Sequence, residues 1–136
     1  MSALRREALA LLAAGVPAMD VQVLSHRGSV PREAGTHMLV TRDAVLGTIG
    51  GGHLELAAIA QARQWLADGD TIPHDAEFAL GPSLGQCCGG ALTLRTQRLG
   101  EAVLAAWHDN APRFFLQLYG AGHVGRAIVT LLAGID

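Results

Sequence analysis

The chain changes from a strand pattern to a helix pattern within Gly47-Thr48-Ile49-Gly50-Gly51-Gly52-His53-Leu54-Glu55. The apolar segment 45–49 predicts a short strand, and residues 53–67 keep apolar side chains on one face, which predicts an amphipathic helix. Three consecutive glycines leave backbone N–H groups free, and a helix N-terminus attracts negative charge. The junction is therefore either a phosphate site to which His53 contributes, or a tight turn in which Glu55 simply stabilises the helix start.

The other segments build an α+β domain around this junction. Apolar spacing and alternation predict helices at 3–14 and 101–108, strands at 21–25, 38–41 and 91–99, and an extended segment at 71–80. We expect a mixed sheet with flanking helices over residues 1–108 and a linker at 109–112. Residues 113–136 then predict the first strand and helix of a Rossmann-type domain that ends before its second strand.

Composition excludes several classes of protein. The chain has 136 residues, of which half are hydrophobic, and a formal net charge of −2, so it can bury the core of one domain. The absence of a basic surplus and the 4% aromatic content argue against nucleic-acid binding. No apolar run approaches the roughly 18 residues of a membrane span. Two adjacent cysteines do not make a disulfide framework, which favours a reducing, cytoplasmic location.

A second glycine loop, Gly28–Gly35, places Arg32 beside a proline. The guanidinium offers a planar fork of donors that suits a phosphate group. The alternative is a structural turn with a surface pair between Arg32 and Glu33.

A third glycine loop, Gly81–Gly90, contains Gln86, Cys87 and Cys88. A thiolate in such a loop suits sulfur transfer, a soft metal or redox exchange. Structural zinc would need four ligands, which two cysteines and scattered histidines do not supply. The alternative is a pair of small side chains packed at the start of a strand.

A fourth motif, Gly120-x-Gly122-x-x-Gly125, follows the apolar segment 113–119 and opens a helix, as in dinucleotide-binding folds. The acidic residue that binds the ribose lies about 20 residues further on, and Asp136 comes too early for it. NAD(P) binding is therefore doubtful. An NAD(P)-binding oxidoreductase fragment, a thiol redox or metal-binding protein and an inactive fragment remain alternatives.

Taken in order, the four motifs resemble the XdhC/CoxI family, the accessory proteins of xanthine dehydrogenase and related molybdenum hydroxylases. The motif Gln-Cys-Cys-Gly-Gly at 86–90 is the most specific of them. The resemblance implies a maturation chaperone more than a turnover enzyme. Such a chaperone binds the molybdenum cofactor, assists its sulfuration with a cysteine desulfurase and delivers it to the apo-hydroxylase. Family members carry a complete Rossmann domain, so the resemblance also implies truncation at Asp136 and leaves a homodimer open.

The cofactor has a terminal phosphate, which the triple glycine, His53 and Arg32 would hold, while a cysteine would approach the molybdenum or relay sulfur. We expect these groups to share one pocket. The candidate site residues are Cys87 and Cys88 for the chemistry, with Arg32, Gly50, Gly51, Gly52, His53, Glu55, Gln86, Gly120, Gly122 and Gly125 for cofactor binding.

Overall fold

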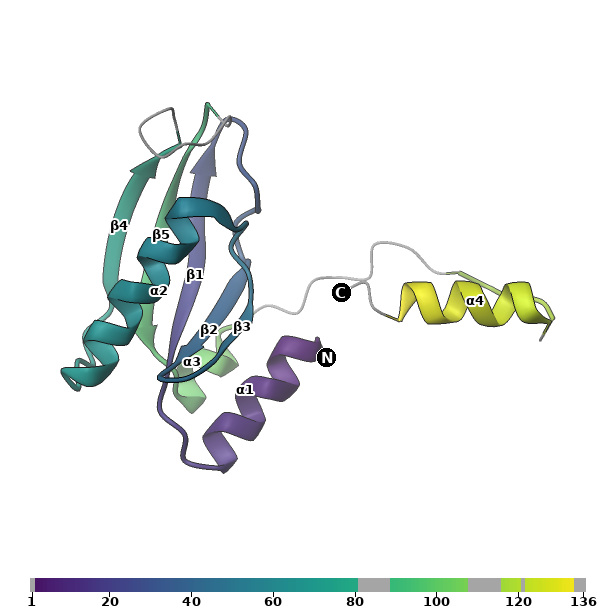
Figure 1. The fold of residues 1–136 in the computed structure, drawn as a ribbon, viewed down its shortest axis with the longest axis horizontal. Coiled ribbons are helices and arrows are strands. Elements are labelled where there is room, and N and C mark those ends of the chain that lie inside the picture. Colours follow the sequence, from purple (N-terminus) through teal and green to yellow (C-terminus); the bar gives the residue numbers. More distant parts are fainter. Residues whose placement is uncertain (1, 81–88, 108–115, 121, 134–136) are drawn as a thin grey trace.

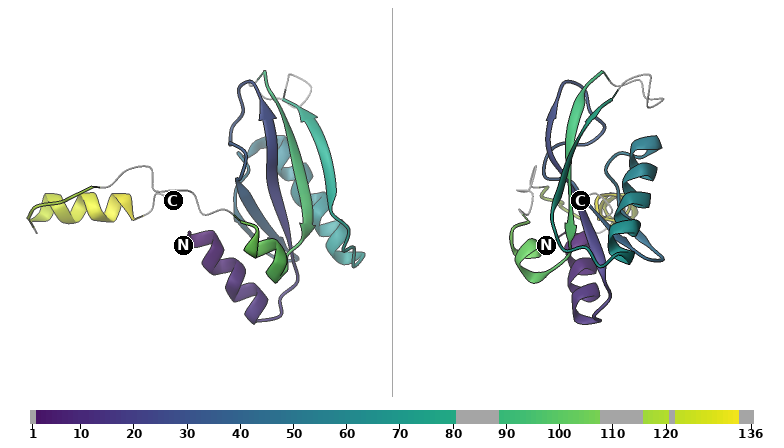
Figure 2. Two further views of the ribbon diagram at one scale, coloured as in Figure 1. Left: turned by 180° about the vertical axis from the view of Figure 1, so that it is seen from behind. Right: turned by 90° about the vertical axis from the view of Figure 1, so that its left-hand side faces the viewer.

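The computed structural model describes residues 2–80, 89–107, 116–120 and 122–133. The elements are α1 (Ala3–Ala13), β1 (Ala18–Arg27), β2 (His37–Thr41), β3 (Val45–Gly47), α2 (Gly52–Ala67), β4 (His74–Ala79), β5 (Ala91–Arg98), α3 (Glu101–Ala105) and α4 (His123–Leu132). The strands form one five-stranded sheet in the order β3-β2-β1-β5-β4. Helix α2 covers one face of this sheet, and α1 and α3 lie against the other (Figures 1 and 2).

The α+β class is confirmed, and all four strand pairings of the described sheet are antiparallel. The reason lies in the connections. A short turn joins β2 to β3, whereas α2 carries the chain from β3 at one edge to β4 at the opposite edge. A parallel pair needs a crossover between neighbouring strands, and α2 does not connect neighbours. The parallel component that a mixed sheet implies is therefore not among these pairings.

Alternation along the strands divides the core into two layers. Met19, Val21 and Val23 of β1 are fully buried in the layer beneath α2. Ala18 of β1 and Leu39 of β2 belong instead to the layer that α1 and α3 cover. Successive strand residues point to opposite faces, so one sheet serves both layers. The two layers hold the sheet rigid and fix the positions of the loops at its ends.

The C-terminal segment differs from the expectation. Residues 116–120 are described but form no strand, although 113–119 predicts one; residues 113–115 lie outside the described part. A strand requires a hydrogen-bonded partner, and no described strand pairs with 116–120. Helix α4 follows as expected and lies apart from the sheet (Figure 1), and its residues belong to neither core layer. Among the described helices, none is both long and apolar enough to cross a membrane.

Candidate functional site

The loop 28–36 lies close both to Gly90, at the described end of the cysteine loop, and to the triple-glycine turn. The loop 28–36 follows β1, and Gly90 precedes β5, the strand beside β1. A Cβ atom built on Gly90 would lie 2.3 Å from the carbonyl oxygen of Ser29 and 2.5 Å from that of Arg27. The backbone of the loop 28–36 therefore rests directly on Gly90, and only glycine fits there.

The same loop also touches the triple-glycine turn. A Cβ atom built on Gly50 would lie 2.5 Å from both Cβ and Cγ of Pro31, and Gly50 has φ of +121°. The loop 28–36 thus bridges the other two loops. We call this assembly, made of residues 28–36 and 47–52 with Leu80 and Gly89–Gly90, the glycine-loop cluster.

The flanks of the cysteine loop are fixed in this cluster. The backbone N–H of Leu80 donates to the carbonyl of Gly90 over 2.8 Å, and the Leu80 side chain is buried in the core under α2. Gln86, Cys87 and Cys88 themselves lie outside the described residues. The predicted pocket shared by the thiols, the guanidinium and the triple glycine therefore stays a prediction, although the loops that carry these groups begin and end in one place.

Two exposed basic side chains belong to this end of the molecule. Arg32 lies in the loop 28–36, and His53 lies in the first turn of α2. Within the described part of the chain, neither side chain makes a hydrogen bond or an ion pair, so the surface pair between Arg32 and Glu33 does not form. Both groups are available to an anionic ligand.

The Glu55 side chain accepts hydrogen bonds from the triple-glycine turn that precedes its helix. Its Oε2 accepts hydrogen bonds from Thr48 Oγ1 at 2.5 Å, from the Ile49 amide at 2.9 Å and from the Gly51 amide at 3.0 Å. The Gly50 amide donates to Thr48 Oγ1 at 3.0 Å. Burial alone raises the pKa of Glu55, but the hydrogen bonds from Thr48 and from the loop amides outweigh it and hold the pKa below its ordinary value. Of the two interpretations of the junction, the turn stabilised by Glu55 accounts for these amides.

The first backbone amides of α2, which follow the triple-glycine turn, are not used by Glu55. Gly51 is the N-cap, and it supplies no side-chain hydrogen bond to the helix start. The amides of Gly52 and His53 have no hydrogen-bond acceptor within the described residues. Free amides at a helix start, next to the exposed His53, can accept an anionic group.

The fourth motif does not belong to the cluster. Gly122 is the N-cap of α4, and a Cβ atom on Gly125 would lie 3.0 Å from the carbonyl oxygen of Gly120 and 3.1 Å from Leu118 Cδ2. The third glycine therefore lets the helix pack closely on the preceding segment, its usual role in a dinucleotide motif. Helix α4 lies away from the cluster in Figure 1 and in the left-hand view of Figure 2.

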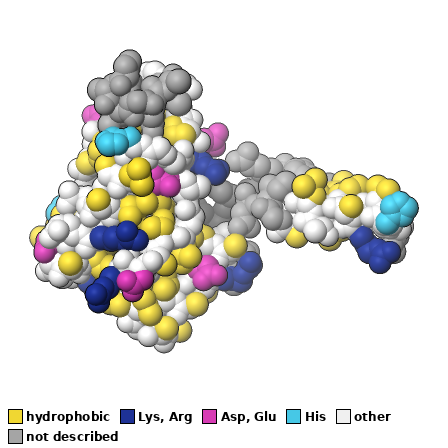
Figure 3. Space-filling view, viewed as in Figure 1, with side chains coloured by type: hydrophobic (Ala, Val, Ile, Leu, Met, Phe, Trp, Pro, Cys, Tyr) yellow, Lys and Arg dark blue, Asp and Glu magenta, His cyan; other side chains and the backbone are white. Residues whose placement is uncertain are grey.

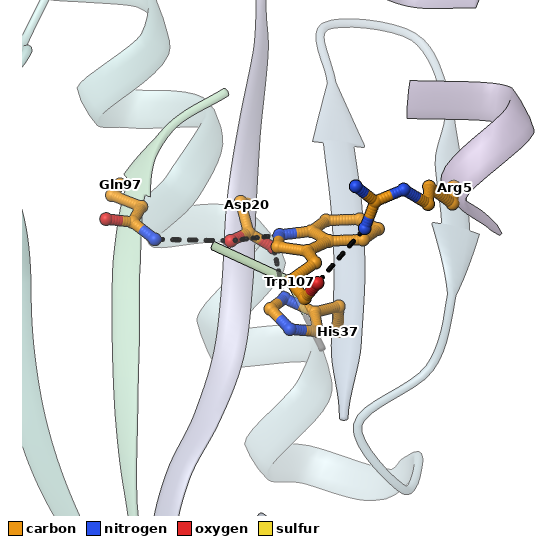
Figure 4. Close-up of polar contacts among 5 residues, drawn as sticks. All are labelled: Arg5, Asp20, His37, Gln97 and Trp107. Atoms are coloured by element: carbon orange, nitrogen blue, oxygen red, sulfur yellow. Dashed lines mark hydrogen bonds and ion pairs between the residues drawn. The ribbon is translucent and has the colours of Figure 1, made fainter. Parts of the chain in front are cut away.

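Sequence reasoning missed a buried polar network on the face covered by α1 and α3 (Figure 4). The carboxylate of Asp20 on β1 is fully buried and contacts His37 Nδ1 at 2.9 Å, Trp107 Nε1 at 3.2 Å and Gln97 Nε2 at 3.3 Å. The His37 ring stacks on Trp107 with centroids 4.2 Å apart, and Arg5 donates to the Trp107 carbonyl. The available signal was a single acidic residue between the apolar Met19 and Val21 of the strand.

The surface shows no single-sign field on the face drawn in Figure 3, where acidic and basic side chains are scattered among apolar ones. No group of three or more His, Cys, Asp or Glu side chains that could hold a metal ion occurs in the described ranges.

These features define an α+β domain that gathers glycine loops, an arginine and a cysteine pair's flanks at one end of an antiparallel sheet. The chain belongs to the XdhC and CoxI family, whose sequence profile matches residues 3–74. This match confirms the resemblance seen in the motifs.

The known proteins similar to this chain include a curated relative and a solved structure. The uncharacterized protein YqeB of Escherichia coli K12 is 35% identical over 135 residues, which cover 96% of this chain and 23% of YqeB. The crystal structure of a xanthine dehydrogenase from Bacillus halodurans matches with a TM-score of 0.63 and 19% identity, over 74% of this chain and 32% of that one. The second likeness concerns the fold. The chain spans about a quarter of the length of YqeB.

Proposed function

We propose that this protein is an accessory protein of xanthine dehydrogenase or a related molybdenum hydroxylase, which binds the molybdenum cofactor and assists its sulfuration and insertion. The observation that supports the proposal is the contact of the loop 28–36 with the triple-glycine turn and with Gly90, which ends the cysteine motif. The contacts of Gly50 with Pro31 and of Gly90 with Ser29 bring together loops that are far apart in the sequence. The name of the structural relative, a xanthine dehydrogenase, points to the same partner.

The chain's own residues would divide the work by their chemistry. Arg32 and His53 would bind the cofactor phosphate, together with the free amides of the α2 first turn. Cys87 or Cys88 would face the metal end, where a thiolate can carry sulfur that a cysteine desulfurase supplies. When bound, the cofactor supplies the molybdenum centre that the partner enzyme needs. The protein holds and orients it and catalyses no turnover of its own.

Retention of the cofactor after gel filtration tests this proposal. Purified protein is mixed with free molybdenum cofactor and compared with the Cys87→Ala/Cys88→Ala and Arg32→Ala variants. Arg42→Ala is the matched control, because Arg42 is an exposed arginine in the turn between β2 and β3, away from the cluster. We expect retention by the wild type and the control and a clear loss in the other two variants. No retention by the wild type would reject the proposal, and equal retention by all variants would reject these residue roles.

The cellular setting and partners extend the same proposal. We propose a cytoplasmic protein, because adjacent thiols in a sulfur-transfer role require a reducing compartment. A cysteine desulfurase and the apo-hydroxylase should each form a complex with it that pull-down detects. Light scattering of the purified chain tests for a homodimer.

Residues 113–136 extend the proposal to a second domain. We propose a first domain at 1–108, a linker at 109–112 and the start of a Rossmann-type domain after it. The close approach of Gly125 to Gly120 supports this assignment. A saturable thermal shift with NAD(P) would favour the oxidoreductase alternative.

A further inference from the structure

The triple-glycine turn contains a complete set of hydrogen bonds to one anion, and the anion is part of the chain. Three donors converge on Glu55 Oε2: the Thr48 hydroxyl and the amides of Ile49 and Gly51, all within 3.0 Å. The Thr48 oxygen in turn accepts from the Gly50 amide. We infer that this turn is an anion site whose permanent occupant is the Glu55 carboxylate, and that a ligand's phosphate does not enter it.

The backbone explains why three glycines are needed for an internal contact. Gly50, Gly51 and Gly52 have φ of +121°, +76° and +71°, a region that side-chain-bearing residues rarely adopt. This path lets the amides on either side of Gly50 point to the same oxygen. The glycine backbone that suggests a phosphate-binding loop is therefore the same backbone that binds the Glu55 carboxylate, which lies one helical turn further along the chain.

Charge decides which anion the turn accepts. A carboxylate that receives three hydrogen bonds is held in its ionised form. A phosphate approaching the Ile49 and Gly51 amides would meet this negative charge and find its donors already used. An anionic ligand is therefore directed to the neighbouring groups that remain free, which are Arg32, His53 and the first amides of α2. This inference stands whether or not the ligand is the molybdenum cofactor.

Amide chemical shifts test the inference directly on the wild-type chain. Uniformly 15N-labelled protein is titrated with inorganic phosphate and, separately, with formate. We expect any saturable shift to be centred on the Gly52 and His53 amides, and the Ile49 amide to be unchanged by either anion. A saturable shift of the Ile49 amide in the wild type would overturn the inference.

Removal of the internal carboxylate supplies the complementary result. In Glu55→Ala the three donors lose their acceptor, so formate should bind in its place. We expect a saturable shift of the Ile49 and Gly51 amides and a melting temperature that rises with formate concentration. Glu33→Ala is the matched control, since the Glu33 side chain is exposed and makes no hydrogen bond within the described residues, and formate should leave this variant unchanged. If the Glu55→Ala protein folds but formate changes neither its Ile49 and Gly51 amide shifts nor its melting temperature, the inference is wrong.

Glu55→Gln covers the case in which the alanine variant does not fold. The amide oxygen of glutamine can accept the same hydrogen bonds without the charge, so this variant should fold and should melt below the wild type. If phosphate produces a saturable shift of the Ile49 and Gly51 amides in the wild type that is as large as the shift in Glu55→Gln, the charge does not exclude ligands and the inference is wrong.

Discussion

Replacing Gly90 by alanine tests the contact that joins the loop 28–36 to the flank of the cysteine pair. The new Cβ would lie 2.3 Å from the Ser29 oxygen and 2.5 Å from the Arg27 oxygen, distances that real Cβ atoms essentially never show. Both opposing atoms are backbone, so the end of β1 and the start of the loop 28–36 have to move together. Overpacking of this kind typically lowers the free energy of unfolding by about 1–3 kcal/mol, and because the opposing atoms are rigid backbone we expect about 3 kcal/mol here.

The neighbouring glycine provides the comparison. A Cβ atom on Gly89 meets nothing within 4 Å, and Gly89 is not among the glycines with positive φ. Gly89→Ala should therefore change stability by at most about 1 kcal/mol, in the stabilising direction, because alanine restricts the unfolded chain.

Thermal unfolding followed by circular dichroism measures both variants. For a domain of roughly 100 residues, 1 kcal/mol shifts the melting temperature by about 4–8 °C, so Gly90→Ala should melt roughly 12–24 °C below the wild type. Gly89→Ala should melt at or slightly above the wild-type temperature. If the two variants melt together, the loop 28–36 does not rest on Gly90 and the glycine-loop cluster does not exist as described.

Three further predictions concern Gly50, Trp107 and Glu55. Gly50→Ala should lower the free energy of unfolding by about 1–3 kcal/mol, because its Cβ would collide with Pro31 at a φ of +121°; an unchanged urea midpoint would contradict this. Trp107→Phe keeps an aromatic ring beside His37 but leaves buried Asp20 without one donor, which should cost about 1–3 kcal/mol in urea unfolding. The pKa of Glu55 is lowered in the folded chain, so its contribution to stability is present above its ordinary value near 4.5 and is lost as pH falls through the folded value. The stability difference between wild type and Glu55→Gln should accordingly be largest near neutral pH and shrink in acid, and a difference independent of pH would refute it.

Local patterns predicted the elements of the first domain well. The helix α2 and the strands β1, β2 and β5 lie where apolar spacing placed them, because each has a face that only a core can cover. The strand predicted at 45–49 ends at Gly47, where the glycine turn begins. The order of the strands could not be predicted from the sequence, because it depends on which edge of the sheet the chain reaches after α2.

The candidate site was predictable only in part. The glycine motifs predicted the loops, but their contacts join residues 19 positions apart (Pro31 and Gly50) and 61 positions apart (Ser29 and Gly90), and no periodic pattern in the sequence indicates such pairs. The role of Glu55 was one of two interpretations, and only side-chain geometry separates them. The network around Asp20 was missed because its partners come from β2, β5 and the end of α3, which converge only in the folded chain.

The carboxylate in the glycine turn also bears on how a carrier exchanges its cargo. A turn that waited for a ligand's phosphate would leave amides unmet, and therefore destabilised, whenever the protein is empty. Here Glu55 accepts the hydrogen bonds of the Ile49 and Gly51 amides, so these amides need no ligand. A carrier of the kind we propose would therefore keep the same turn with and without its ligand, and release of the ligand would break only its contacts with the exposed groups.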